Sequence, residues 1–214
     1  HELGDFTYMH SLIFRSSKFT FLLLAVISFP ILLETEMILQ LWLNMVPAYT
    51  VVFVRLMLCI TIIDAMGGAF MVAAQSTGRV RFYQSVVGGI LLAIVPVSYV
   101  VLRLGAAPWS VFLIHFCVCT VAFFVRLFII RSMIHLSLYS YFHAVLLRCL
   151  YVLLLAMPLP IGLLYIFPAT LWAGISVCFV SVLTISLSSY RVGLAEGERK
   201  FIKEKIRMFL SISN

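Results

Sequence analysis

The sequence predicts an all-α, polytopic membrane protein, and three observations lead to this class. Hydrophobic residues make up 64% of the 214 residues, whereas soluble domains are about 45–50% apolar. Charged residues make up only 11% and fall in short bands between long apolar runs. Those runs approach the roughly 20 residues that a helix needs to cross a bilayer. They are also too long and continuous for the alternating strands of a membrane barrel.

Six apolar runs are predicted to cross the membrane. The first covers Phe19–Leu33 and is extended by Met37–Leu43 beyond two glutamates. The other five, in chain order, cover Val51–Ala74, Tyr83–Leu102, Trp109–Ile130, Val145–Phe167 and Thr170–Ser188. Pro96, Pro158 and Pro160 lie inside spans. We therefore expect a kink or a break in the third and fifth spans, because proline removes a helical hydrogen bond.

The orientation of the spans follows from the positions of lysine and arginine. Basic residues precede the first span, separate spans two and three and spans four and five, and follow span six. The loops after spans one and five contain none. Since cytoplasmic loops carry the excess of basic residues, both ends of the chain are predicted to be cytoplasmic. This banding is typical of membrane topology, and it argues against nucleic acid as a partner.

The chain divides into three predicted segments. Residues 1–18 form a polar or amphipathic cytoplasmic segment, residues 19–188 form the six-span lobe, and residues 189–214 form a basic cytoplasmic tail. Within the tail, one helical stripe contains Phe201, Ile202, Lys205, Ile206, Phe209 and Leu210. The stripe predicts an amphipathic helix on the membrane surface, and a solvated polar tail is the alternative. We also expect this chain to be part of a larger protein.

Asp64 is the most unusual residue of the second span, because an ionised side chain inside a membrane is costly. Its neighbours on the same helical face are Ile60, Thr61, Gly67 and Gly68. Glycines beside a carboxylate allow close helix contact or local unwinding. Two interpretations stay open: a cation, proton or gating site, or a hydrogen-bonded aspartate that helps two helices to pack.

Arg55 belongs to the same span but cannot neutralise Asp64. Nine residues rotate a helix by about 900° and advance it by about 13 Å, so the two side chains lie on opposite faces. Asp64 therefore needs a partner on another helix, water or an ion. Arg55 itself is predicted either to extend outward to the membrane surface or to line a lumen.

Three further residues are candidate substrate contacts. Arg148 suits an anion such as phosphate, with extension to the surface as the alternative. His115, in the fourth span, is either a ligand or a packing residue, and Gln75 contacts substrate or caps a helix end. No catalytic motif, metal-binding motif or cofactor motif is present, and the five cysteines lie in apolar runs, where we expect small buried hydrophobic residues. An enzyme is therefore not predicted.

Two stretches of the chain are similar to sequence patterns of a known family. The run FPILLETEMILQLWLNMVPAYTVVFVRLMLC is similar to a family pattern at Pro30, Ile38–Leu43, Pro47 and Arg55. Asn44 departs from that pattern, in which glycine is usual. The run AAQSTGRVRFYQSVVGGILLAIVPVSYVVLRLGAAP is similar to a second pattern at Gln75, Thr77, Gly78, Arg79, Tyr83, Pro96, Gly105 and Pro108. By these two stretches the chain resembles polysaccharide-lipid flippases of the multidrug/oligosaccharidyl-lipid/polysaccharide exporter superfamily. The resemblance covers residues 19–131 well and the rest weakly.

The resemblance implies the C-terminal lobe of a MATE-like transporter with two six-helix lobes around a central cavity. The implied function is to flip undecaprenyl-pyrophosphate-linked oligosaccharide across the bacterial cytoplasmic membrane by alternating access, with coupling to Na⁺ or H⁺. The implied partners are that lipid-linked oligosaccharide, membrane lipids and an N-terminal lobe. Arg55 is the one basic residue carried over from the family as a substrate contact, and no family motif maps onto Asp64.

Three other functions remain open from the sequence. A multidrug or cation antiporter of the same superfamily would make Asp64 its ion-binding residue. A membrane-embedded glycosyl- or acyltransferase would need acidic or histidine residues gathered at one membrane face, and here they are scattered. A scaffold subunit without transport activity would not need Asp64, Arg55 and His115 inside its spans.

Overall fold

The computed structural model describes residues 2–43, 45–166, 170–195 and 197–199. Over this part of the chain the protein is 87% helical and has no strands. Six helical stretches are long and apolar enough to cross a membrane: Tyr8–Leu33, Thr50–Ser76, Val80–Arg103, Ser110–Ile134, Leu138–Ile166 and Leu171–Gly193. The structure confirms the predicted class, an all-α, multi-pass membrane protein.

Most spans consist of more than one helix. Span one is the long helix α1 (Glu2–Leu33), and α2 (Thr35–Trp42) follows it as a short separate helix. Span two consists of α3 (Thr50–Met66) and α4 (Gly68–Ser76), and span three of α5 (Val80–Leu92) and α6 (Ile94–Arg103). Span four is the single helix α7 (Ser110–Ile134). Span five is made of α8 (Leu138–Tyr141), the π-helical turn η1 (Phe142–Leu146), α9 (Leu147–Ala156) and α10 (Pro158–Ile166). Span six is α11 (Leu171–Ser188) with the π-helical turn η2 (Ser189–Gly193).

Proline accounts for the breaks in spans three and five. Helix α5 ends at Leu92, whose carbonyl is four residues before Pro96 and is the one that the proline ring displaces. In span five, Pro158 is the first residue of α10. Proline is tolerated at this position, because the N–H of the first helical residue has no partner within the helix. The break in span two has no proline and falls at Gly67.

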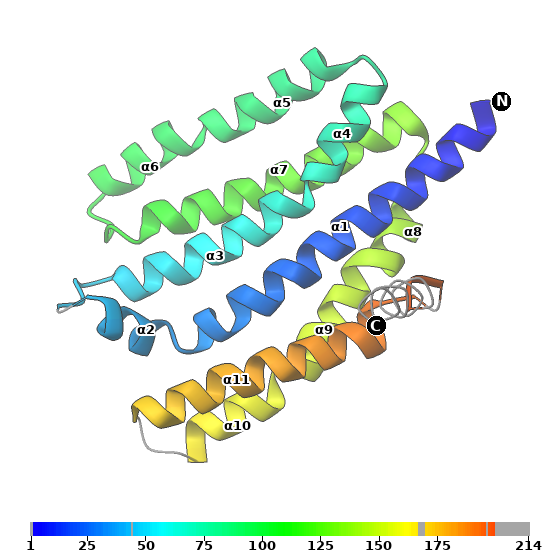
Figure 1. The fold of residues 1–214 in the computed structure, drawn as a ribbon. Coiled ribbons are helices and arrows are strands. Elements are labelled where there is room, and N and C mark those ends of the chain that lie inside the picture. The colour runs from blue at the N-terminus through cyan, green and yellow to red at the C-terminus, as the bar shows by residue number, and fades with distance from the viewer. Residues whose placement is uncertain (1, 44, 167–169, 196, 200–214) are drawn as a thin grey trace.

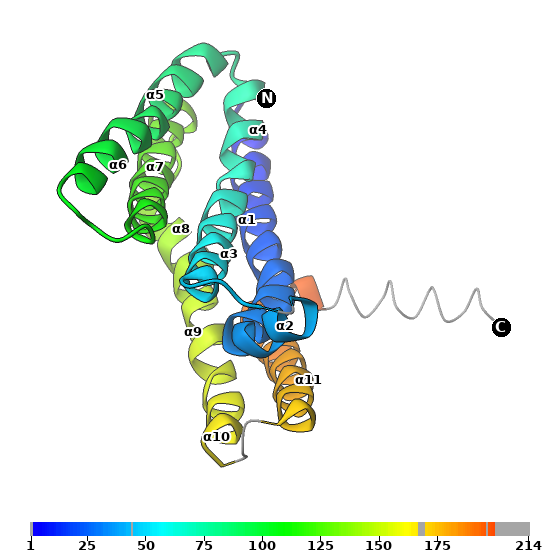
Figure 2. The ribbon, with the colours of Figure 1, turned by 90° about the vertical axis from the view of Figure 1, so that its left-hand side faces the viewer.

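Helix α1 lies at the centre of the bundle (Figure 1). It packs against α3 and α4 on one side and against α11 and α9 on the other. Helix α7 packs on the outer side of α3, and α5 and α6 pack on α7 at the edge of the bundle (Figure 2). The segment 1–18, predicted as a separate cytoplasmic segment, continues into span one as a single helix from Glu2 onward.

Four aromatic rings join the helices at the core. Phe70 and Tyr141 are completely buried, with ring centroids 5.4 Å apart. Phe123 of α7 lies 5.6 Å from Phe70, and Phe14 of α1 lies 5.6 Å from Tyr141. Spans one, two, four and five therefore meet at this cluster. Of the cysteines, Cys119 and Cys149 are buried, Cys59 and Cys178 are partly buried, and Cys117 is exposed.

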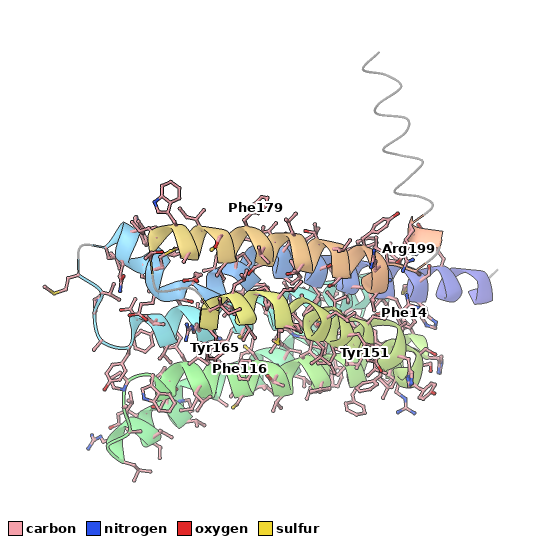
Figure 3. All side chains as sticks on the ribbon, turned by 90° about the horizontal axis from the view of Figure 1, so that it is seen from below. Phe14, Phe116, Tyr151, Tyr165, Phe179 and Arg199 are labelled. Carbon is pink, nitrogen blue, oxygen red and sulfur yellow. The ribbon has the colours of Figure 1, made fainter. Side chains whose placement is uncertain are left out.

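The outer surface is apolar, as a lipid-facing surface must be. Phe179 of α11 and Tyr165 of α10, both labelled in Figure 3, are exposed. Trp42, Trp109 and Trp172 are exposed at helix ends, the positions at which tryptophan contacts the membrane–water interface. The stripe predicted in the tail, 201–210, lies outside the described residues.

Side chains from neighbouring helices complete the hydrogen bonds that helix breaks leave open. The Ser17 hydroxyl donates to the carbonyl of Met66, the last residue of α3, at 3.0 Å. The Arg55 Nε–H donates to the Leu32 carbonyl in the last turn of α1 at 3.1 Å. Satisfying such carbonyls inside the protein is what makes irregular helices tolerable within a membrane.

A buried ion pair joins α1 to the C-terminal part of the described chain. The Lys18 ammonium lies 2.5 Å from the Glu198 carboxylate, and the two side chains are only 5% and 8% exposed. Glu198 Oε2 also accepts from the Ala195 N–H at 2.8 Å. Lys18 is inside the first candidate span, so each charge depends on the other for compensation.

Replacing Lys18 by methionine is expected to lower the free energy of unfolding by about 3–5 kcal/mol, because it leaves Glu198 buried and unpaired. The double variant Lys18→Met/Glu198→Gln should recover much of this loss. Thermal unfolding of the purified protein in detergent measures both. Arg15→Met, an exposed cation one turn earlier, is the control and should change stability little. Equal effects of Lys18→Met and Arg15→Met would contradict the interpretation.

Candidate functional site

Asp64 pairs with Arg126, which lies on a different span. The Arg126 Nη1 atom of α7 lies 2.7 Å from Oδ1 of Asp64 in α3. Both residues are near the middle of their spans. The sequence predicted that Asp64 would need a partner from a second helix, water or an ion, and the structure supplies a second helix. Arg126 was counted from the sequence only as part of a basic band.

The residue that makes room for this pair is Gly67. A Cβ atom at position 67 would lie 2.5 Å from Nη1 of Arg126, closer than atoms in contact can be. The backbone of Gly67 has a φ of −72°, which any residue can adopt, so the glycine is needed for space rather than for conformation. Gly68, next to it, has nothing within 4 Å of its equivalent position.

The two charges are unequally covered. The Arg126 side chain is 13% exposed, whereas that of Asp64 is 58% exposed. The guanidinium is thus held within the protein, and the carboxylate lies at the surface of the helical bundle. The buried Nε–H of Arg126 has no acceptor among the described residues, so the arginine retains an unused donor. Pairing makes the site neutral overall, which lowers its cost in the membrane.

A cavity of about 470 Å³ lies beside the pair. It is formed by the α3–α4 break, α5 and α7, and its lining consists of Asp64, Gly67, Gly68, Met71, Tyr83, Gln84, Val87, Gly88, Leu91 and Arg126. Its size is in the range of small-molecule sites, about 300–1,000 Å³. The carboxylate, guanidinium, phenol and amide can together bind a polar or charged group within an otherwise apolar wall. We call it the Asp64–Arg126 cavity.

The other four predicted site residues do not line the Asp64–Arg126 cavity. Arg55 binds the junction of α1 and α2, with its Nε also 3.4 Å from the Thr35 hydroxyl. His115 is partly buried in α7, Arg148 is partly buried in α9, and Gln75 is exposed in the last turn of α4. Their roles as substrate contacts stay predictions.

A second, smaller cavity of about 330 Å³ lies between α2, α10 and α11. Glu34, Glu36, Gln40 and Thr170 are its polar lining residues. Glu34 lies between the first span and α2, and burial raises the pKa of its carboxyl above the ordinary value. Gly174 leaves space there for the Met37 side chain. Across the residues that the structure describes, no group of three His, Cys, Asp or Glu side chains is arranged to hold a metal ion.

One signal in the sequence could have identified Arg126. In a six-span chain, spans two and four cross the membrane in the same direction. Asp64 is fourteen residues after Thr50, where span two begins, and Arg126 is sixteen residues after Ser110, where span four begins. The two charges are therefore at the same depth in the membrane, and an acid and a base at one depth compensate each other at the least cost.

The fold and the site define a multi-pass membrane protein with an ion pair held between two of its spans. Comparison of the chain with protein-family models, curated proteins and solved structures finds no match.

The two adjacent glycines provide a matched test of this geometry. Gly67→Ala is expected to displace the Arg126 guanidinium, so the gain of about 0.5–1 kcal/mol that alanine usually brings to a helix should be cancelled or reversed. Gly68→Ala meets no atom and should keep that gain. Thermal unfolding of both variants in detergent measures the difference. A Gly67→Ala variant as stable as Gly68→Ala would show that the guanidinium does not need this space.

Proposed function

We propose that this chain is one lobe of a transporter that flips undecaprenyl-pyrophosphate-linked oligosaccharide across the bacterial cytoplasmic membrane. The resemblance at residues 19–131 supports the class of substrate. The observation that carries the proposal is the exposed carboxylate of Asp64, which lies mid-span with 58% of its side chain uncovered. Lipid is a costly environment for that group, so it faces a water-filled cavity or a second lobe.

In this proposal, Arg126 is the contact for the pyrophosphate. Guanidinium groups bind phosphate oxygens through paired N–H donors, and Arg126 has an unused Nε–H donor. With no substrate bound, Asp64 neutralises the arginine. When the substrate arrives, its phosphate competes with the carboxylate for the same guanidinium, so binding changes the contact between α3 and α7.

The remaining predicted site residues have subsidiary roles in the proposal. Arg55, His115, Arg148 and Gln75 contact the substrate at other depths as it moves. Alternating access requires the N-terminal lobe, which we propose lies against the exposed side of the Asp64–Arg126 cavity. Both ends of the chain are cytoplasmic in this arrangement, and an Na⁺ or H⁺ gradient drives transport.

A cation antiporter of the same superfamily is the second candidate. The exposed carboxylate of Asp64 favours it, because an anionic oxygen is the group that binds Na⁺ or H⁺. Arg126 opposes it, since a cation would have to replace the guanidinium that already lies 2.7 Å from Oδ1. Exchange of a cation for the arginine would then be the coupling step.

Asp64→Asn and Arg126→Gln are each expected to slow flipping of the lipid-linked oligosaccharide by about tenfold or more. Hydrogen bonds to a charged group contribute about 1.5–3 kcal/mol, which corresponds to this range. The exchanged pair Asp64→Arg/Arg126→Asp should recover part of the rate. The measurement is the initial rate of flipping by the complete two-lobe transporter in proteoliposomes.

Glu36→Gln serves as the control, because Glu36 is exposed and outside the candidate spans. It should flip at the unaltered rate. Unchanged flipping by Asp64→Asn, with normal membrane insertion, would reduce the pair to a packing contact. If the unaltered protein exports drugs in exchange for a cation but does not flip the lipid-linked oligosaccharide, and Asp64→Asn loses that export, the antiporter would be established instead.

A further inference from the structure

A second group of polar residues lies where α7 ends and span five begins. A cavity of about 540 Å³ is lined there by Arg131, His135, Leu136, Ser137, Leu138 and Tyr139. We call it the α7–α8 pocket. It shares no residue with the Asp64–Arg126 cavity and has no part in the proposed flipping reaction.

The pocket carries positive charge without a matching acid. Arg131 is exposed in the last turn of α7, and His135 follows with an exposed imidazole. The two ion pairs formed within the described residues are Lys18–Glu198 and Asp64–Arg126, and neither includes Arg131. No aspartate or glutamate lines the pocket.

Several hydrogen-bonding groups of the pocket can donate. The Ser137 hydroxyl oxygen already accepts from the Ser140 N–H at 3.3 Å and from the Ser140 hydroxyl at 3.0 Å, so its own O–H is left to donate. The N–H groups of residues 135–137 form no backbone hydrogen bond in the described part of the chain. His135 is left-handed, with a φ of 54°, and a left-handed residue after a helical one gathers successive N–H groups into an anion-binding concavity.

The floor of the pocket is apolar. Leu136 is buried and Leu138 is partly buried. The exposed Tyr139 follows them, and its ring is tilted by 38° against that of His143, with centroids 4.2 Å apart. A pocket of this kind, at the end of two membrane-spanning helices, is at the depth of lipid headgroups, where basic pockets bind anionic lipids.

We propose that the α7–α8 pocket binds a phosphate group, with Arg131, His135 and the Ser137 hydroxyl as its ligands. An anionic phospholipid is the source that the position favours, because the glycerol and acyl chains then lie along the apolar helices. The guanidinium takes two phosphate oxygens, as its planar fork allows, and the Ser137 hydroxyl donates to a third.

The test is native mass spectrometry of the purified chain with phosphatidylglycerol or phosphatidylcholine. Phosphatidylglycerol is expected to be retained preferentially. Arg131→Gln should weaken that retention about tenfold or more, the loss expected when hydrogen bonds to a charged group are removed. Arg131→Lys keeps the positive charge but lacks the planar guanidinium that binds two phosphate oxygens. It should therefore retain part of the bound phosphatidylglycerol, which would show that the variant is folded. Arg81→Gln is the matched control, an exposed arginine in the first turn of α5, and should bind as the unaltered chain does.

A competition experiment separates the two sources of phosphate. If millimolar inorganic phosphate displaces phosphatidylglycerol, the pocket is a phosphate site for a soluble ligand. If it does not, the lipid itself is the ligand. Equal retention of the two lipids, or equal loss in Arg131→Gln and Arg81→Gln at unchanged melting temperature, would overturn the proposal.

Discussion

The constraint on which this structure depends is that a charge inside the membrane must be compensated by the protein itself. Hydrocarbon offers no water to solvate an ion, so a buried charge fixes which helices meet. The Asp64–Arg126 pair joins spans two and four, and the Lys18–Glu198 pair joins span one to the residues that follow span six. These two pairs link segments 62 and 180 residues apart in the chain.

The same constraint applies to the backbone. Spans two, three and five are interrupted, and each interruption frees carbonyl groups that the bilayer cannot satisfy. Side chains of neighbouring helices satisfy carbonyls at such a break and at the ends of spans. Ser17 does so at the end of α3 and Arg55 in the last turn of α1, and the His10 ring binds the Ile134 carbonyl at the end of α7, at 2.9 Å. Polar residues of the spans thus serve the structure itself, and Arg55, which binds the junction of α1 and α2, is an example.

Much of the fold was predictable because it follows from local composition. Hydropathy identified six spans, and proline marked the breaks in spans three and five. At Gly67 the sequence predicted close helix contact or local unwinding without deciding between them, because the space that this glycine leaves is for Arg126, a residue of a distant span. The Asp64–Arg126 pair could be predicted only by comparing the depths of the two residues in spans two and four, which cross the membrane in the same direction. The π-helical turns η1 and η2 had no identifiable sequence signal.

The position of α1 has a consequence for biosynthesis. This helix is made before its neighbours, so the later spans can assemble against it in the order in which they leave the translocation machinery. The carboxylate that pairs with Lys18 of this helix, however, belongs to Glu198, which is synthesised 180 residues later. Until Glu198 is synthesised, the helix α1 carries an ammonium without its partner carboxylate. A chain cut short before Glu198 therefore keeps this ammonium without its partner carboxylate.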